Sequence, residues 1–254
     1  MNEYRRSFAA MATIFEIIIR GDDAQHLEAV GVAVSEEIER LSLKLSRFDP
    51  QSEVSRINRH AHRGPVRIDR ELFELLEECD EAQRFTGGYF DVTGGGGWNL
   101  DRSSLTVELP GPGVIIDPGG IGKGYALDRG GELIRQYGIT SALLQGGTSS
   151  ILAIGEDDWP VDVRHPDSPE RIAASLSLRN RAFSCSAARH PGERSSDLRN
   201  PHTGQMVASD EGCFVLAQRA TTAEIWSTAL IVKGHESSRE SVLPAELETF
   251  WIRE

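Results

Sequence analysis

Hydrophobic and polar residues alternate along the chain with two different periods. Between residues 24 and 45, apolar side chains recur every three or four positions, the pattern of an amphipathic helix with one buried face. Its apolar positions are Leu27, Val30, Val34, Ile38, Leu41 and Leu45. Capping residues and apolar spacing predict three more helices, from an Asp69 cap to Phe85, over 122–137 and over 221–233.

Short apolar segments predict strands in the rest of the chain. Residues 13–20 are β-branched and aromatic, which indicates a strand buried on both faces. Two apolar runs around Pro110-Gly111-Pro112-Gly113, at 105–109 and 114–117, predict a hairpin. Hairpin-length links between successive strands favour antiparallel pairing with helices on one face, and so an α+β fold rather than a doubly wound parallel sheet. The further predicted strands are 141–145, 149–155, 159–164, 172–178, 181–186, 212–218 and 247–252.

Length and charge narrow the class of protein. A chain of 254 residues suits one domain over residues 1–254, or two closely packed subdomains. The chain has 27 Lys and Arg against 39 Asp and Glu, a formal charge of -12 that argues against a nucleic-acid partner. It contains no apolar run long enough for a membrane helix and no apparent secretory signal, so we expect a cytoplasmic protein with no membrane span.

The densest candidate for chemistry is the segment from Asp117 to Tyr125, where a predicted strand ends in glycines and a helix begins with Lys123. Backbone amides at a helix start and one ammonium group form an anion site, and the alternative is that the glycines only make a tight turn. The segment is not a phosphate-binding P-loop, because Asp117 stands where that motif needs glycine and Gly124 replaces its Ser or Thr. No GxGxxG follows a strand, so a Rossmann fold has no support.

Two further patterns are compatible with ligand binding. Glu224 and Thr228 are four residues apart on a predicted helix, so both reach the same face and offer oxygen ligands to Mg²⁺. Taken alone, the pair is a weak signal and better suits a solvated glutamate and a threonine bonded to a backbone carbonyl. Tyr89 and Phe90 follow a glycine pair and either stack on a planar ring or fill the core.

Taken together and in order, several segments resemble the FAD:protein FMN transferase family, also called ApbE-like flavin transferases. The resemblance extends over nearly the whole chain. Its segments are Met11-Ala12-Thr13, Ser46-Arg47-Phe48, Ser52 to Asn58, Gly88-Tyr89-Phe90-Asp91, Asp117 to Asp128, Gly146-Gly147, Asn200-Pro201-His202-Thr203-Gly204 and Ala223 to Leu230.

The resemblance implies an α+β fold related to tandem T-folds and binding of FAD and Mg²⁺. Members move FMN from FAD to a threonine of an acceptor protein and release AMP, and some instead hydrolyse FAD to FMN and AMP. It implies a magnesium site formed by the Gly120 carbonyl, Glu224 and Thr228. The implied FAD contacts are Met11, Phe48, Tyr89, Phe90, Asp91, Asp117 and Lys123.

Three positions differ from the family pattern. Glu224 stands where the family has aspartate, Thr148 replaces the acid of a Gly-Gly-Asp motif, and Asp197 replaces the histidine that serves as the presumed base for the acceptor threonine. A carboxylate is a weaker base than imidazole by roughly two to three pKa units. The predicted catalytic residues are therefore Asp197 and Glu224, in a flavin transferase, an FAD hydrolase or a flavin-nucleotide-binding protein without catalysis.

Overall fold

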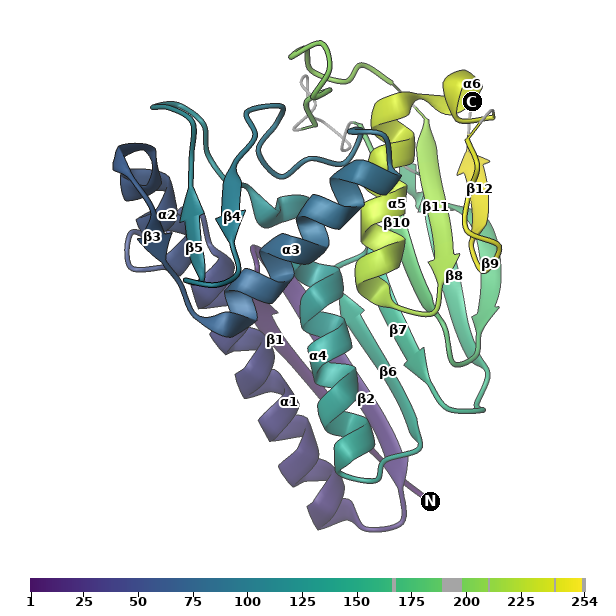
Figure 1. Cartoon of the computed structure of the whole chain (residues 1–254). Coiled ribbons are helices and arrows are strands. Elements are labelled where there is room, and N and C mark those ends of the chain that lie inside the picture. Colours follow the sequence, from purple (N-terminus) through teal and green to yellow (C-terminus); the bar gives the residue numbers. More distant parts are fainter. Residues whose placement is uncertain (166–167, 189–197, 210, 240, 253–254) are drawn as a thin grey trace.

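The computed structural model describes residues 1–165, 168–188, 198–209, 211–239 and 241–252. Its central element is a seven-stranded antiparallel sheet with the strand order β1-β2-β6-β7-β10-β11-β12 (Figure 1). With helices packed against this sheet, the fold is α+β, as the sequence predicts. The strands are β1 (Asn2–Ala10), β2 (Thr13–Gly21), β6 (Ser141–Gly146), β7 (Ser150–Ile154), β10 (Ala182–Ala187), β11 (Gly212–Ala217) and β12 (Glu248–Ile252).

Three helices cover one face of the main sheet: α1 (Ala24–Leu45), α4 (Gly122–Gln136) and α5 (Ala220–Lys233) (Figure 1). The apolar stripe of α1 faces inward, where Ile38 and Leu41 pack with the buried side chains Ile17 and Ile19 of β2. Burial of these apolar stripes supplies the main hydrophobic core. Because α4 and α5 pack against each other, their first turns meet at one edge of this core.

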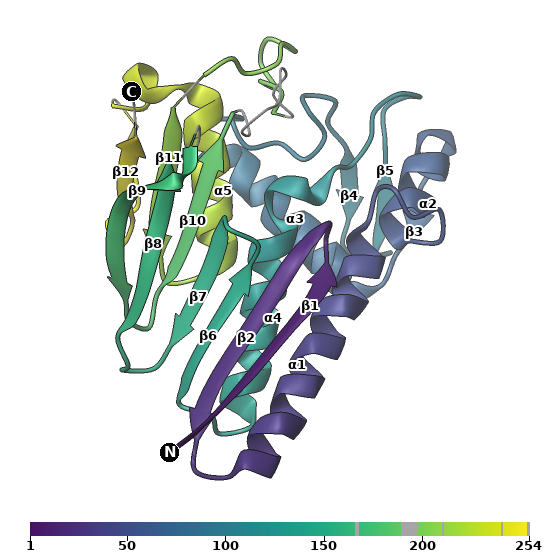
Figure 2. The same cartoon turned by 180° about the vertical axis from the view of Figure 1, so that it is seen from behind.

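The opposite face of the main sheet is covered by a separate two-stranded sheet of β8 (Trp159–His165) and β9 (Ser168–Leu178) (Figure 2). Trp159 and Val161 of β8 are buried with Phe183 and Phe214 of the main sheet. Apolar residues on both faces therefore keep the central strands out of water, which explains their nearly continuous apolar sequences.

A second hydrophobic core lies beside the main sheet, and α5 joins the two cores. Ile225 and Ala229 of α5 belong to the second core, whereas Ala223 and Trp226 belong to the main core. Apolar contacts therefore surround α5, and polar groups on it are enclosed by protein. The elements around the second core are α2 (Glu53–His60), η1 (Ala61–Arg63), β3 (Val66–Arg67), α3 (Arg70–Phe85), β4 (Asn99–Asp101), β5 (Thr106–Glu108) and η2 (Pro118–Gly120). A short helix, α6 (His235–Ser238), follows α5.

The helices predicted at 24–45, 69–85, 122–137 and 221–233 are confirmed, as is the strand at 13–20. The predicted strands from residue 141 onward are confirmed as well, although β8 and β9 stand apart from the main sheet. Sequence analysis missed β1, which pairs with β2 at the edge of the sheet. Its residues are mostly solvent-facing, so it lacks the apolar run of a central strand.

The predicted hairpin of residues 105–109 and 114–117 is wrong. Thr106–Glu108 instead pairs with β3 on one side and β4 on the other. Pro112 lacks an N–H group and cannot support a regular ladder in the connecting segment. The side chain of Asn58 binds Ile116 in place of a strand: its Oδ1 accepts from the Ile116 amide at 2.7 Å, and its Nδ2 donates to the carbonyl at 2.9 Å.

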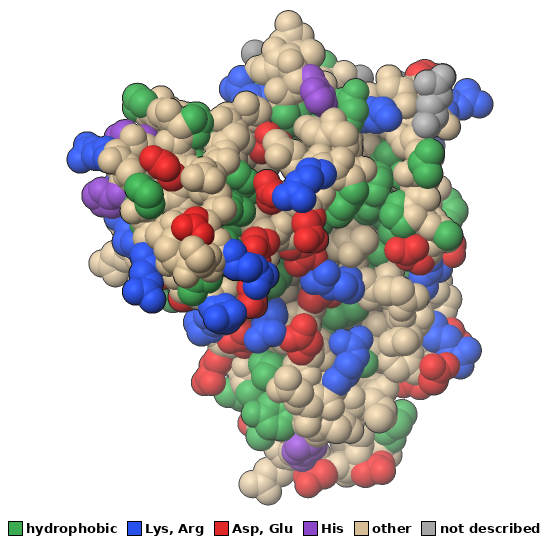
Figure 3. Space-filling view, viewed as in Figure 1, with side chains coloured by type: hydrophobic (Ala, Val, Ile, Leu, Met, Phe, Trp, Pro, Cys, Tyr) green, Lys and Arg blue, Asp and Glu red, His purple; other side chains and the backbone are tan. Residues whose placement is uncertain are grey.

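On the face shown in Figure 3, Lys and Arg side chains lie among Asp and Glu side chains rather than forming a continuous basic area. Within the described ranges, none of the helices has the length and apolar character needed to cross a bilayer.

Candidate functional site

The glycine-rich turn before α4 is held by side chains from distant segments. Asp117 caps η2, where its Oδ1 accepts from the Gly119 amide at 3.0 Å. Its Oδ2 lies 2.9 Å from Nε of Arg47. The Asp117 amide donates to the carbonyl of Val92 at 2.8 Å. Asp117 therefore fixes the turn, and the segment 46–48 reaches the same point as the sequence resemblance expects.

Lys123, in the first turn of α4, and Glu224, in the second turn of α5, meet directly. Their Nζ and Oε1 atoms are 3.0 Å apart, and the side chains are 23% and 4% exposed. Two neutral donors complete the carboxylate's contacts: the Ser150 hydroxyl reaches Oε1 at 2.6 Å, and the Gly124 amide reaches Oε2 at 2.8 Å. Glu224 is thus buried and paired, so the interpretation of it as a solvated glutamate is wrong.

Gly120 lies next to Thr228, one helical turn beyond Glu224. A Cβ atom on Gly120 would lie 3.5 Å from the Thr228 hydroxyl oxygen and 3.4 Å from the Phe90 ring. The three residues expected to bind Mg²⁺ therefore come together. Their carboxylate, hydroxyl and carbonyl oxygens suit a hard cation. Because no group of three or more His, Cys, Asp or Glu side chains among the described residues is placed to hold a metal ion, Glu224 would supply the formal charge of such a site.

A chain of serine hydroxyls lies behind Glu224 and Thr228, and sequence reasoning missed it. The Ser227 hydroxyl is 3.0 Å from that of Ser184 and 2.8 Å from that of Ser186. Ser184 is also the register partner of Ser150 on the neighbouring strand. Polar residues at alternating positions of β10, beside otherwise apolar strands, were the available signal. These hydroxyls give the buried end of the site hydrogen-bonding partners.

Gly124 and Asp128 fix α4 against α5. A Cβ atom at position 124 would come within 2.5 Å of the Ala220 carbonyl oxygen. Asp128 accepts from the amides of Ala220 and Thr221 at 2.8 and 3.0 Å, and from the Thr221 hydroxyl at 2.6 Å. Burial raises the pKa of Asp128, while these hydrogen bonds oppose the shift. Asp128 thereby caps α5 from a neighbouring helix and sets the position of Glu224.

Replacing Asp128 with alanine is expected to lower the free energy of unfolding by about 1–3 kcal/mol, since two buried amides and one hydroxyl lose their acceptor. Chemical denaturation measures this change. Asp22→Ala is the matched control, because the Asp22 side chain is fully exposed. Equal stability of the Asp128 and Asp22 variants would contradict this role for the cap.

The predicted aromatic contacts differ in exposure. Phe90 is 2% exposed and belongs to the second core. Phe48 is 77% exposed, and the guanidinium carbon of Arg47 lies over its ring, 4.1 Å from the ring centroid. Tyr89 packs against both cores and meets the ring of His202 edge-on, with centroids 4.6 Å apart. The rings of Phe48 and Tyr89 are thus more accessible to a planar ligand than that of Phe90. Contact of any of the three with FAD stays a prediction.

Asp91 shapes the glycine loop that follows it. Its carboxylate accepts from Gln83 Nε2 at 2.8 Å, from the amide and hydroxyl of Thr93 at 2.7 Å each, and from the Gly95 amide at 2.9 Å. A Cβ atom on Gly95 would lie 2.6 Å from the Pro201 carbonyl oxygen. Asp91 therefore brings the glycine loop against the Asn200 to Gly204 segment, and contact of Asp91 with FAD remains a prediction.

The other predicted positions are spread around the same region. Met11 has φ of 49°, donates its amide to the Ser42 hydroxyl at 2.8 Å and packs against both cores. Thr148 is exposed in the turn between β6 and β7. Asp197 lies outside the described residues.

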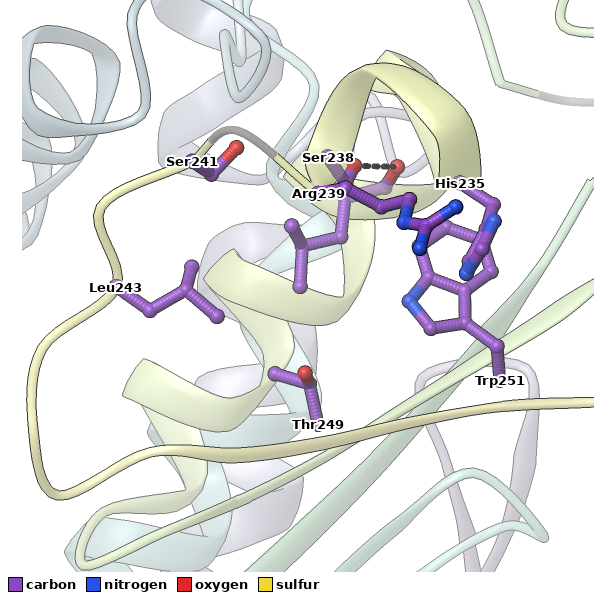
Figure 4. Close-up of a pocket in the computed structure, with 8 residues that line it drawn as sticks. His235, Ser238, Arg239, Ser241, Leu243, Thr249 and Trp251 are labelled. Atoms are coloured by element: carbon purple, nitrogen blue, oxygen red, sulfur yellow. Dashed lines mark hydrogen bonds between the residues drawn. The ribbon is translucent and has the colours of Figure 1, made fainter.

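A hollow of about 250 Å³ between α6 and β12 is separate from these predicted positions (Figure 4). The rings of His235 and Trp251 meet edge-on at its wall, with centroids 5.0 Å apart. Among the described residues, none of the sequence-predicted site residues lines it. The candidate site is therefore defined by the convergence of polar groups between α4, α5 and η2, and not by this hollow.

An antiparallel sheet with helices on one face, and a glycine-rich turn with Lys123 beside a carboxylate and a hydroxyl on α5, define the structural class. Within that class, the chain belongs to the ApbE family: the model described as "ApbE family" matches residues 11–106 and 97–251. The resemblance found in the sequence is confirmed. Relatives named FAD:protein FMN transferase come from Salmonella typhimurium and Treponema pallidum. They are 22% and 24% identical, over 95% and 94% of this chain and 82% and 81% of their own lengths. The chain is thus assigned to a family of transferase enzymes.

Solved structures show the same fold. The ApbE protein from Thermotoga maritima matches with a TM-score of 0.85 and 23% identity, over 95% of this chain and 90% of its own. Flavin transferase ApbE from Vibrio cholerae matches with a TM-score of 0.81 and 19% identity, over 98% and 92%. These likenesses support the α+β assignment.

Proposed function

We propose that this protein moves the FMN half of FAD onto a threonine hydroxyl of an acceptor protein and releases AMP. The observation that carries the proposal is the meeting of Lys123, Glu224, Thr228 and Gly120 between the two cores, in a chain of the ApbE family. A cation, a carboxylate and neutral oxygens at one point suit a pyrophosphate and a divalent metal ion.

Phosphoryl transfer accounts for the arrangement of these groups. The acceptor hydroxyl oxygen forms a bond to the FMN phosphorus, the phosphorus–oxygen bond to AMP breaks, and the hydroxyl proton passes to a base. Lys123 lies in the first turn of α4, and the start of a helix favours anions. Its ammonium group adds a positive charge there and would bind the pyrophosphate. We propose Asp197 as the base that accepts this proton, on the sequence alone.

Mg²⁺ is the metal that this donor set suits. The Gly120 carbonyl, the Glu224 carboxylate and the Thr228 hydroxyl would hold it, with phosphate oxygens and water as further ligands. When bound, Mg²⁺ neutralises charge on the pyrophosphate and on departing AMP. Around it, α5 holds the carboxylate and hydroxyl one turn apart, and Asp128 fixes the start of that helix.

Replacing Lys123 with alanine is expected to weaken FAD binding in the presence of Mg²⁺ by about 10-fold to 100-fold, because an ion pair to phosphate is lost. Calorimetric titration with FAD measures the effect. Arg102→Ala is the matched control, since the Arg102 side chain is 68% exposed and pairs with Glu77. Unchanged affinity in the Lys123 variant would refute the placement of the pyrophosphate.

FAD hydrolysis is the second candidate. Asp197 stands at the presumed base position as a weaker base than imidazole, and Thr148 removes one acid, so water is a more favourable nucleophile than in other members. AMP release without attached flavin distinguishes hydrolysis from transfer. Binding of FAD without AMP release identifies a flavin-nucleotide-binding protein instead.

A further inference from the structure

Two residues proposed to bind different ligands are bound to each other. Lys123 would bind the pyrophosphate of FAD, and Glu224 would bind the metal ion, yet their side chains form an ion pair at 3.0 Å. Both Glu224 oxygens are in use: Oε1 accepts from Lys123 and from Ser150 at 2.6 Å, and Oε2 from the Gly124 amide at 2.8 Å.

The packing of α4 and α5 preorganises this ion pair. Gly124 lets the two helix starts approach, and Asp128 ties α4 to the first two amides of α5. The pair therefore does not depend on two flexible surface side chains, unlike the exposed ion pairs of this protein. At 4% exposure, the Glu224 side chain would be strongly destabilised if it lost its counter-charge and gained no other.

We propose that the Lys123–Glu224 pair makes binding of FAD and of the divalent cation mutually dependent. This inference rests on the proposed function. If FAD bound alone, Lys123 would move to its pyrophosphate. The Glu224 carboxylate would then lose its counter-charge and repel the pyrophosphate. The cation alone would displace the Lys123 ammonium and leave two like charges together. When both bind, the charges of the ammonium, carboxylate, cation and pyrophosphate cancel, so each ligand strengthens the binding of the other.

The first test is titration of FAD, followed by flavin fluorescence, with Mg²⁺ or with a chelator. For the parent, we expect Mg²⁺ to strengthen FAD binding by at least about 30-fold, within the usual range of coupling between two ligands. In Glu224→Gln, Lys123 is released and the repelling charge is gone. Its metal-free affinity should exceed that of the parent by about 10-fold, and the Mg²⁺ effect should fall below about 3-fold.

Glu132→Gln is the matched control, because it also removes one negative charge, here from an exposed position on α4 where Glu132 pairs with Arg129. It should keep the Mg²⁺ dependence of the parent. Circular dichroism melting verifies that the Glu224 variant is folded.

A second variant changes Lys123, the other member of the pair, and tests the proposal even if Glu224→Gln does not fold. Lys123→Met leaves Glu224 free for a cation. We expect Mn²⁺, measured by electron paramagnetic resonance without flavin, to bind this variant about 10-fold more tightly than the parent. Mn²⁺ should also raise the melting temperature of the variant more than that of the parent, because it replaces the lost counter-charge.

Equal FAD affinity of the parent with and without Mg²⁺ would overturn the proposal, as would a metal-free affinity that falls in Glu224→Gln. Unchanged Mn²⁺ affinity in Lys123→Met would overturn it too. These results leave the proposed function standing. Failure of the folded parent to bind FAD even with Mg²⁺ would overturn the proposed function, and this inference with it.

Discussion

FMN transfer by a Glu224→Ala variant is expected to fall by at least about 100-fold, which is the scale of losing a charged group that stabilises a phosphoryl transition state. The substitution removes the proposed metal-binding carboxylate. It also removes the partner of Lys123 and the acceptor for the Gly124 amide. AMP release from FAD, followed by chromatography, measures the loss.

The matched control is Glu132→Ala, an exposed glutamate on α4 that pairs with Arg129. Its AMP release should equal that of the parent. Melting curves separate lost chemistry from lost folding, since a folded but inactive Glu224 variant is the expected result. If folded Glu224→Ala releases AMP at the parental rate, Glu224 has no part in the reaction.

The second large effect is expected from Gly124→Ala, a change of one methyl group. The added Cβ would lie 2.5 Å from the Ala220 carbonyl oxygen and 2.8 Å from the Thr221 nitrogen, and both atoms belong to backbone. Helix α5 must therefore shift as a body, which we expect to lower the free energy of unfolding by about 2 kcal/mol or more. Denaturant titration measures this, and FAD affinity should fall in the same variant.

Gly111→Ala is the matched control for the glycine effect, because a Cβ atom there meets open space. That variant should be as stable as the parent. Parental stability of Gly124→Ala would mean that α4 and α5 tolerate wider separation than their contact implies.

Local pattern predicted most of the fold because burial dictates it. The stripe from Leu27 to Leu41 faces the main sheet, and the apolar strand at 13–20 is enclosed between two layers. The edge strand β1 was not predicted, because its residues are mostly solvent-facing and lack the apolar run of a central strand. The hairpin error at 114–117 arose from a long-range partner, Asn58, that no local pattern contains.

The site was predictable only in part, for a related reason. Motif order singled out Lys123, Glu224 and Thr228, and the fold brings them together. Nothing in the sequence indicated that Asp91 and Asp117 bind protein donors, as they do in the fold, and their contact with FAD stays a prediction. The alternating serines of β10 are visible in the sequence, but the contacts that the hydroxyls at 150, 184 and 227 make depend on strand register and helix packing.

The most direct test of the proposed transfer uses the purified protein, FAD, Mg²⁺ and a peptide containing an acceptor threonine. AMP is measured by chromatography, and flavin on the peptide by mass spectrometry and fluorescence. The account predicts AMP and covalently attached flavin in equal amounts, with no attachment when the threonine is replaced by valine. FAD that stays intact, or AMP formed while the peptide stays unmodified, would contradict it.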